Sequence, residues 1–315
     1  MKVYNLKFRI FSLLLVFSLV SYNTFAQEPT KVKASSAQLD NALLWEISGN
    51  GLAKPSYLFG TIHIINGADY FLPNQTLSSI DKSEKMYFEI DMAGMSDMST
   101  IMGMMDKLFM NDDKTLKDLL SAEDYELVSE YFSDMGLPIF FMQRIKPLLL
   151  SALANKDMNP NAMNDGTMKS YEIELNKIAQ AKGMPTAGIE TIEFQVGIFD
   201  KIPYDKQAEM LMAAIKAEGE ATSQMDDMIK LYKEQNISGL YKMIQGDNDG
   251  LMDFEDDLLV NRNIAWIPII EREVKIQPTF IAVGAGHLPG DKGVINLLKE
   301  KGYTVKALSA TQVKK

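Results

Sequence analysis

Two histidines are the residues in this sequence with the clearest capacity for chemistry. The chain of 315 residues contains His63 and His287 and has no cysteine. It therefore lacks thiol nucleophiles, disulfides, iron–sulfur clusters, and zinc sites that need cysteine or three imidazole ligands. Each histidine ends a Gly-x-x-His motif, at residues 60–63 and 284–287. A histidine in such a motif can bind a metal or transfer a proton near neutral pH.

The two motifs share one structural context, which favours a functional pair. Apolar segments at residues 57–63 and 279–284 predict strands that lead into the motifs. In open α/β sheets, ligands bind at the carboxyl ends of strands, and glycine there lets the backbone turn or approach a ligand closely. A single loop histidine usually only makes hydrogen bonds, so the inference depends on the repetition.

Acidic residues near other predicted strand ends are candidates to act with the histidines. Glu89 and Asp91 lie on one face of a predicted strand at residues 86–91, and Glu190 ends another short strand. A buried carboxylate is costly unless it is paired or binds a metal, which favours a functional role for Glu89 and Glu190. Asp91 fits a helix cap equally well, and Glu193 fits a structural role better. A metal site built from both histidines and one or two carboxylates remains open.

Motifs and net charge exclude several function classes. Ile64-Ile65-Asn66 follows His63, so the His-Glu-x-x-His protease motif is absent, and no Gly-x-Ser-x-Gly elbow occurs. The net charge of −10 argues against nucleic-acid binding, because phosphate contacts need clustered lysine and arginine. Beyond the first 26 residues, no apolar run approaches the about 18 residues of a membrane helix, so we expect no membrane association there.

The order of the predicted elements indicates an α/β (α+β) fold. Strands cluster towards both ends of the chain, which predicts a central mixed sheet of N- and C-terminal strands with a large helical insertion. The first two strands are expected to be antiparallel. The predicted strands cover residues 43–48, 57–63, 86–91, 184–190, 279–284 and 303–308, and the predicted helices include residues 74–82, 171–182 and 292–301, with a further helix beginning at Ser121 and ending at Gly136.

The N-terminus has the layout of a secretory signal peptide. A basic start, an apolar run at residues 10–20 and the small-x-small end Thr24-Phe25-Ala26 predict cleavage after residue 26. The mature protein is then expected to be exported, to the periplasm or the extracellular space. Residues 27–41 are expected to form a flexible lead-in, and residues 42–310 a single domain with a helical lobe at about 92–182 and 204–276.

A methionine stripe allows a third kind of chemistry. Five methionines recur at steps of three and four residues, which places them on one face of a helix: Met92, Met95, Met98, Met102 and Met105. Core packing is the favoured interpretation. A surface for a peptide partner and a Cu(I) site, since thioethers are soft ligands, are the alternatives.

The ordered set of short motifs resembles the TraB/GumN family, which includes the Tiki metalloproteases and relates more distantly to erythromycin esterase-like proteins. The resemblance implies a metal-dependent hydrolase, most plainly a peptidase acting on peptide or protein substrates. The motifs that carry it are Leu58-Phe59-Gly60-Thr61-Ile62-His63, Leu72-Pro73, Phe88-Glu89-Ile90-Asp91, Gly188-Ile189-Glu190-Thr191 with Gln195, Asn261-Arg262-Asn263, and Val283-Gly284-Ala285-Gly286-His287.

By position and by this resemblance, four side chains are expected to converge around one divalent ion. His63, His287, Glu89 and Glu190 would supply mixed nitrogen and oxygen ligands, which suit Zn, Mn or Co. A glutamate left over would act as general base. Arg262 would stabilise developing negative charge or, equally, brace one of the glutamates. Supporting or substrate contacts are expected from Gly60, Asp91, Asn263, Gly284 and Gly286. The alternative function is a non-catalytic protein that binds or sequesters peptides in the same cleft.

Overall fold

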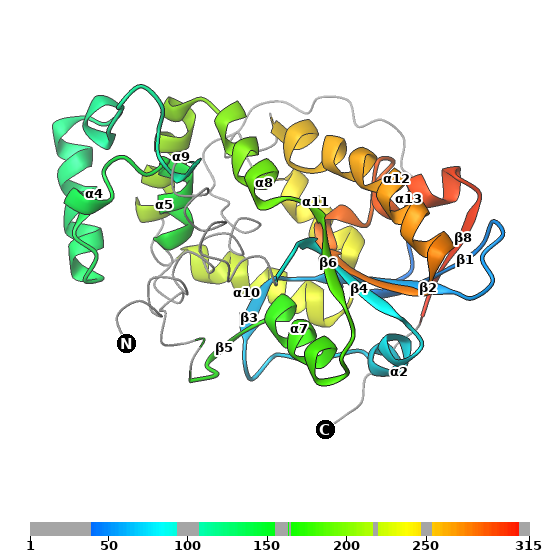
Figure 1. The fold of residues 1–315 in the computed structure, drawn as a ribbon. Helices are drawn as coiled ribbons and strands as arrows, with labels where there is room; N and C mark the ends of the chain where they lie inside the picture. Colours follow the sequence, from blue (N-terminus) through cyan, green and yellow to red (C-terminus); the bar gives the residue numbers. More distant parts are fainter. Residues whose placement is uncertain are drawn as a thin grey trace.

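Strands from both ends of the chain form one sheet, which confirms the predicted fold class. The computed structural model describes residues 39–92, 107–154, 163, 165–216, 220–246 and 254–308. Within these ranges a six-stranded mixed sheet has the order β6-β4-β7-β2-β1-β8 (Figure 1). Its strands are β1 (Leu44–Gly49), β2 (Ser56–Thr61), β4 (Lys85–Ile90), β6 (Thr186–Glu190), β7 (Thr279–Gly284) and β8 (Tyr303–Ala307).

Four neighbouring strands of the sheet run parallel. β2 pairs with β7, β7 with β4, and β4 with β6, so their carboxyl ends lie along one edge. The register sets Thr61 opposite Gly284 and Ile90 opposite Glu190. β1 is antiparallel to β2, as predicted, and also to β8. The sheet therefore gathers at one edge segments that are far apart in the sequence.

Helices bury both faces of the sheet in one large apolar core. β2 and β7 are buried along their whole length, which explains their continuous apolar sequence. In Figure 1, α7 and α12 lie on opposite sides of the sheet. The helices of this part are α2 (Thr76–Asp81), α7 (Tyr171–Ala181), α10 (Glu220–Lys233), α11 (Ile237–Gln245), α12 (Asn261–Ile276), which follows a π-helical turn at Asp256–Val260, and α13 (Val294–Glu300).

A helical lobe lies beside the sheet and has its own apolar core. Phe132, Leu150 and Leu211 are fully buried there. Ser121 caps α4 by accepting from Asp124 N at 3.1 Å, and Gly136 follows the helix with a φ of 71°, as the sequence predicts. The helices of the lobe and its junction with the sheet are α4 (Ala122–Asp134), α5 (Pro147–Leu153), α8 (Ile192–Ile198) and α9 (Tyr204–Lys216).

A small second sheet was missed by the sequence analysis. β3 (Ile64–Asn66) pairs with β5 (Met168–Ser170) in antiparallel register, with Ile64 opposite Ser170. The sequence pattern predicts no strand directly after residue 63 and a helical lobe from about residue 92 to 182. Three residues are too few to show the alternation that identifies a strand. The pair joins the end of β2 to the start of α7, since Tyr171 N donates to His63 O at 2.9 Å.

Several predictions fall on residues outside the described ranges. These are the signal peptide at residues 1–26, most of the lead-in, and Met95, Met98, Met102 and Met105. Met92 is described, and it is buried in the core of the large sheet. Among the described helices, none combines the length and the apolar character needed to cross a membrane.

Candidate active site

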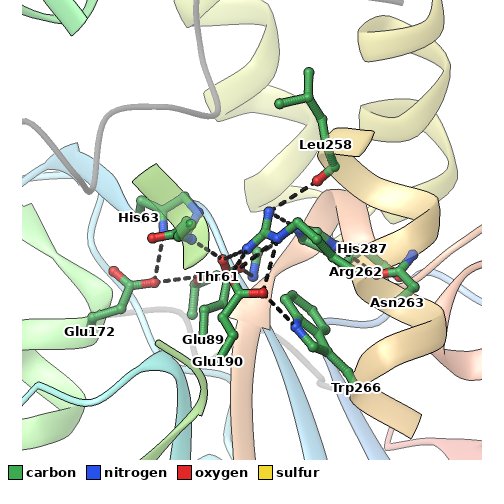
Figure 2. Close-up of polar contacts among 12 residues, drawn as sticks. Thr61, His63, Glu89, Glu172, Glu190, Leu258, Arg262, Asn263, Trp266 and His287 are labelled. Atoms are coloured by element: carbon green, nitrogen blue, oxygen red, sulfur yellow. Dashed lines mark hydrogen bonds and ion pairs between the residues drawn. The ribbon is translucent and has the colours of Figure 1, made fainter. Parts of the chain in front are cut away.

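The parallel edge of the sheet brings the predicted side chains into one cluster (Figure 2). Glu89 lies near the end of β4, Glu190 ends β6, and His63 follows β2. His287 lies in a short 3-10 turn, Ala285–His287, directly after β7. The side chains of Glu89, Glu190 and His287 are at most 9% exposed, and that of His63 is 12% exposed. The cluster is therefore shielded from bulk water.

Arg262 of α12 connects three members of the cluster. Its Nη2 donates to Glu89 Oε2 and to Glu190 Oε1, each at 2.6 Å, and its Nη1 donates to His287 Nε2 at 3.2 Å. Nη1 also donates to Leu258 O at 3.0 Å, in the preceding π-helical turn. Arg262 therefore holds both glutamates in place at once, which fits the second of its two predicted roles, the bracing of a glutamate.

The buried charges alter the pKa values of both glutamates. Burial disfavours the charged form of Glu89, but Arg262 and the two histidines outweigh it, and the pKa of Glu89 is held below its ordinary value. Burial raises the pKa of Glu190, although Arg262 opposes this shift. Glu89 is also fixed by Gly284 N, which donates to Oε1 at 2.8 Å, and by Gln195 Nε2, which donates to Oε2 at 3.0 Å. The Glu89 carboxylate thus has an assigned partner on each oxygen.

His287 is held as a neutral imidazole. Its Nε2 accepts a hydrogen bond from Arg262, which can only donate, so the ring proton lies on Nδ1. Nδ1 then donates to Asn263 Oδ1 at 2.7 Å, while Asn263 Nδ2 donates to Lys292 O at 2.9 Å. The Trp266 ring lies 4.5 Å from the imidazole. Burial, followed by the charge of Arg262, lowers the pKa of His287 to about 3.

His63 faces the cluster from the other side (Figure 2). Its Nδ1 lies 2.8 Å from Glu172 Oε1, which also accepts from Thr61 Oγ1 at 2.7 Å. Burial favours the neutral ring, but Glu172 and Glu89 outweigh it and raise the pKa of His63 to about 9. The residue has a φ of 55°, a left-handed conformation that is strained outside glycine. The orientation of the His63 ring therefore depends on a backbone conformation that is unfavourable by itself.

His63 Nε2, Glu89 Oε1 and the ring edge of His287 lie around one point in front of Gly284. A Cβ built on Gly284 would lie 3.1 Å from His63 Nε2, 3.3 Å from Glu89 Oε1 and 3.5 Å from His287 Cδ2. Within the described ranges, no group of three His, Asp or Glu side chains is gathered tightly enough to hold a metal as it stands. The donors nevertheless suit one divalent ion in kind, with two imidazole nitrogens and one carboxylate oxygen. Arg262 would have to give up its hydrogen bond to His287 Nε2.

Glu190 is more fully occupied than the other predicted metal ligands. Arg262 donates to Oε1 through Nε and Nη2, and Trp266 Nε1 donates to Oε2 at 2.9 Å. Arg262 Nε also contacts Oε2, at 3.3 Å. Glu190 therefore has hydrogen-bond donors on both oxygens, and its position is set by Arg262 and Trp266.

The remaining predicted residues lie around the cluster in different ways. Gly60 packs tightly, because a Cβ there would approach Leu288 Cδ1 to 2.8 Å. At Gly286 a Cβ would meet the end of the Ile244 side chain. Asp91, just after β4, and Glu193, on α8, are exposed.

Glu172, Thr61 and Trp266 belong to the cluster, and the sequence analysis did not select them. Glu172 lies in the first turn of α7, where an acidic residue is normally explained by the helix dipole. Trp266 has the pattern of a core aromatic residue in an amphipathic helix. Thr61 lies inside the first Gly-x-x-His motif, which was the one available signal. Their roles depend on β3 and β5, and on how α12 packs, which local sequence does not encode.

The comparisons with known proteins agree with the resemblance seen in the sequence. Metalloprotease TIKI1 of Danio rerio is 23% identical, with 90% of this chain and 67% of the relative aligned. The metalloprotease TIKI homolog of Amphimedon queenslandica is 22% identical over 88% and 64% of the two chains, and metalloprotease TIKI1 of Homo sapiens is 21% identical over 87% and 63%.

This chain thus spans about two thirds of the length of these curated relatives. No solved structure gives a significant match. The model of the TraB/PrgY/gumN family matches residues 43–307, which include the whole sheet and the whole buried cluster. The chain therefore belongs to the TraB/PrgY/gumN family.

Proposed function

We propose that this protein is a metal-dependent peptidase whose divalent ion is held by His63, His287 and Glu89. One observation carries the proposal. The Nδ1 atom of each histidine is hydrogen-bonded to an oxygen of another side chain. The opposite edges of the two rings and Glu89 Oε1 lie around one point beside Gly284. A hydrogen bond from one ring nitrogen to an oxygen is the usual arrangement of metal-binding histidines. Nε2 of His63 already points to this place, and Nε2 of His287 becomes available once Arg262 Nη1 gives up its hydrogen bond.

The names of the relatives support the reaction class. Proteins that are 21–23% identical are called metalloproteases, which suggests a peptide or protein substrate and a divalent ion. The two imidazoles and one carboxylate suit Zn, Mn or Co. When bound, such an ion lowers the pKa of a coordinated water and polarises the scissile carbonyl.

Arg262 and Glu190 take the remaining roles in this proposal. Arg262 is buried and positively charged, and it is positioned to stabilise negative charge that develops on the carbonyl oxygen. Glu190, the carboxylate outside the donor set, holds Arg262. In this proposal it is also the group that accepts a proton, because burial raises the pKa of Glu190 and so favours the protonated form.

A peptide-cleavage assay with a glycine variant tests the proposal. Gly284→Ala should abolish turnover, because the new methyl group fills the space between the donors, while a φ of −53° and ψ of 135° suit alanine. Gly197→Ala, where a Cβ meets no atom within 4 Å, is the control and should cleave normally. A chelator should stop the wild-type protein, and Zn, Mn or Co should restore it.

The alternative function predicts a different set of results. A protein that only sequesters peptides would bind them equally well with and without a chelator, and would never release cleaved fragments. That outcome would overturn the peptidase proposal.

Export is a separate part of the proposal, and it is supported by the sequence of residues 1–26 alone. Secretion from the native host should leave a mature chain that begins at Gln27. N-terminal sequencing of the purified native protein measures this directly, and a chain that still begins at residue 1 would contradict it.

A further inference from the structure

Glu172 is a buried carboxylate whose hydrogen bonds all converge on the side chain of His63 and its surroundings. It is 6% exposed. Oε1 contacts His63 Nδ1 at 2.8 Å and accepts from Thr61 Oγ1 at 2.7 Å, while Oε2 accepts from Ser170 Oγ at 3.1 Å. A buried charge needs such partners to be tolerated. The arrangement leaves one ring nitrogen of His63, Nε2, directed towards Glu89 and Gly284.

The small sheet explains why Glu172 reaches His63. Ile64 of β3 lies opposite Ser170 of β5, and Tyr171 N donates to His63 O at 2.9 Å. Ser170 also caps α7, because its side chain accepts from Ile173 N at 3.3 Å. The strand pair and the cap thus fix the first turn of α7 beside the Gly-x-x-His motif, with the Glu172 side chain turned inwards.

The two histidines are oriented by chemically different partners. Asn263, a neutral amide, holds Nδ1 of His287, whereas Glu172, a carboxylate, holds Nδ1 of His63. An amide offers either an oxygen or an NH₂ group, but a carboxylate offers only oxygens. As a carboxylate, Glu172 can therefore accept a hydrogen bond from the Nδ1–H group and cannot donate one to Nδ1.

We propose that Glu172 is a positioning residue that fixes the proton of the neutral His63 ring at Nδ1, so that Nε2 is free to face Glu89 and His287. The consequence for metal binding rests on the proposed function, whereas the tautomer itself does not. Carboxylates that hold a ligand histidine in this way typically contribute 10- to 100-fold to metal affinity.

The tautomer is measurable because the chain has only two histidines. Long-range ¹H–¹⁵N spectra of the metal-free protein, recorded above the His63 pKa of about 9, resolve the four ring nitrogens. The variant His287→Gln assigns them. We expect the His63 proton at Nδ1 in the wild type. Glu172→Ala should move it to Nε2, the form that an unconstrained histidine favours.

Two further variants separate positioning from a general structural role. Glu172→Gln keeps an oxygen that can accept from Nδ1, so it should restore the wild-type tautomer. Glu174→Ala removes an acidic residue of the same helix that pairs with Lys169 and Lys177 instead, so it should leave the spectrum unchanged. If Glu172→Ala does not fold, the wild-type spectrum decides the question, because an Nε2 proton there would contradict the inference.

Zinc affinity, measured by chelator competition, is the second readout. Glu172→Ala should bind zinc about 10- to 100-fold more weakly than the wild type, and Glu172→Gln should lie close to the wild type. A His63 proton at Nε2 in the wild type, or at Nδ1 in folded Glu172→Ala, would overturn the inference. Failure of wild-type zinc binding with the expected tautomers would overturn the proposed function alone.

Discussion

Arg262 sets the charge balance of the buried site at the scale of single residues. It is 7% exposed and contacts two glutamates and a neutral histidine. If Arg262 lost its positive charge, Glu89 and Glu190 would lie together in a buried site without the guanidinium that balances their charge. The guanidinium offsets the burial of both carboxylates because it donates hydrogen bonds to them together.

Replacement of Arg262 should therefore be strongly destabilising. Arg262→Gln leaves two buried carboxylates without their partner, and we expect a loss of about 3–5 kcal/mol in the free energy of unfolding. Arg272→Gln on the same helix is the matched control. The Arg272 side chain is 63% exposed and its ion pair with Glu273 should contribute less than about 1 kcal/mol. Urea unfolding measures both, and equal losses would contradict the assigned role.

The sequence identified the residues that lie in the cluster better than it identified the residues that orient them. His63, His287, Glu89 and Glu190 stand out because histidine is rare and because charge within apolar strands is costly, whereas Arg262 stands out only through the resemblance to the TraB/GumN family. They lie together in the structure, and their catalytic and metal-binding roles are proposals. Glu172 and Trp266 could not be selected, since an acidic residue in a first helical turn and an aromatic residue on a buried helix face have common structural explanations.

At the scale of elements, the parallel pairing of β4 with β6 is what places Glu190 beside Glu89. Phe88 lies opposite Gly188, and a Cβ on Gly188 would approach Asp91 N to 2.4 Å and Ile90 C to 2.8 Å. These neighbours are backbone atoms, which cannot rotate out of the way. Close contact between the two strands therefore requires glycine at this position.

The variant Gly188→Ala tests this requirement. The added methyl group should force the strands apart and cost about 1–3 kcal/mol in the free energy of unfolding. Gly197→Ala, in the following helix α8, meets no atom within 4 Å and should be neutral or stabilise the protein by up to about 1 kcal/mol. Thermal unfolding of the two variants distinguishes these outcomes. A Gly188→Ala protein as stable as the wild type would show that β6 is not held in this register.

Long elements were predictable from the sequence, and very short ones were not. β2, β7 and α4 have apolar runs or caps that local patterns reveal. β3 and β5 have three residues each, and only their pairing across about a hundred residues of chain identifies them. β3 and β5 place Glu172 next to His63. Both the strand pair and Glu172 were therefore missed in the sequence for one reason, which is that neither can be identified without the long-range pairing.

At the scale of the whole molecule, the sheet and the helical lobe have different apolar cores, and a third cluster joins Ile90, at the end of β4, to α5 and α9. The sheet core contains Phe59, Phe88 and Phe280, whereas the lobe core contains Phe132 and Leu211. The fold class follows from the placement of strands at both ends of the chain. The strand order does not, because it depends on long-range parallel pairing that no local pattern specifies.

Separate cores predict separable effects of mutation. Phe132→Ala removes a fully buried ring and should lower the local free energy of unfolding of the lobe by about 3–5 kcal/mol. Hydrogen exchange should accelerate in α4, α5 and α9, while wild-type zinc affinity is retained. A fall in zinc affinity as large as that of His63→Ala would show instead that the lobe and the buried cluster are one cooperative unit.

The central claim is that His63, His287 and Glu89 hold one divalent ion beside Gly284. Anomalous diffraction from crystals soaked with zinc locates such an ion directly. We predict a single strong peak in front of Gly284, about 2.0–2.2 Å from Nε2 of each histidine and from a Glu89 oxygen. Arg262 Nη1 should then have left His287. A peak elsewhere, or no peak at this position with Arg262 still bound to His287, would contradict the claim.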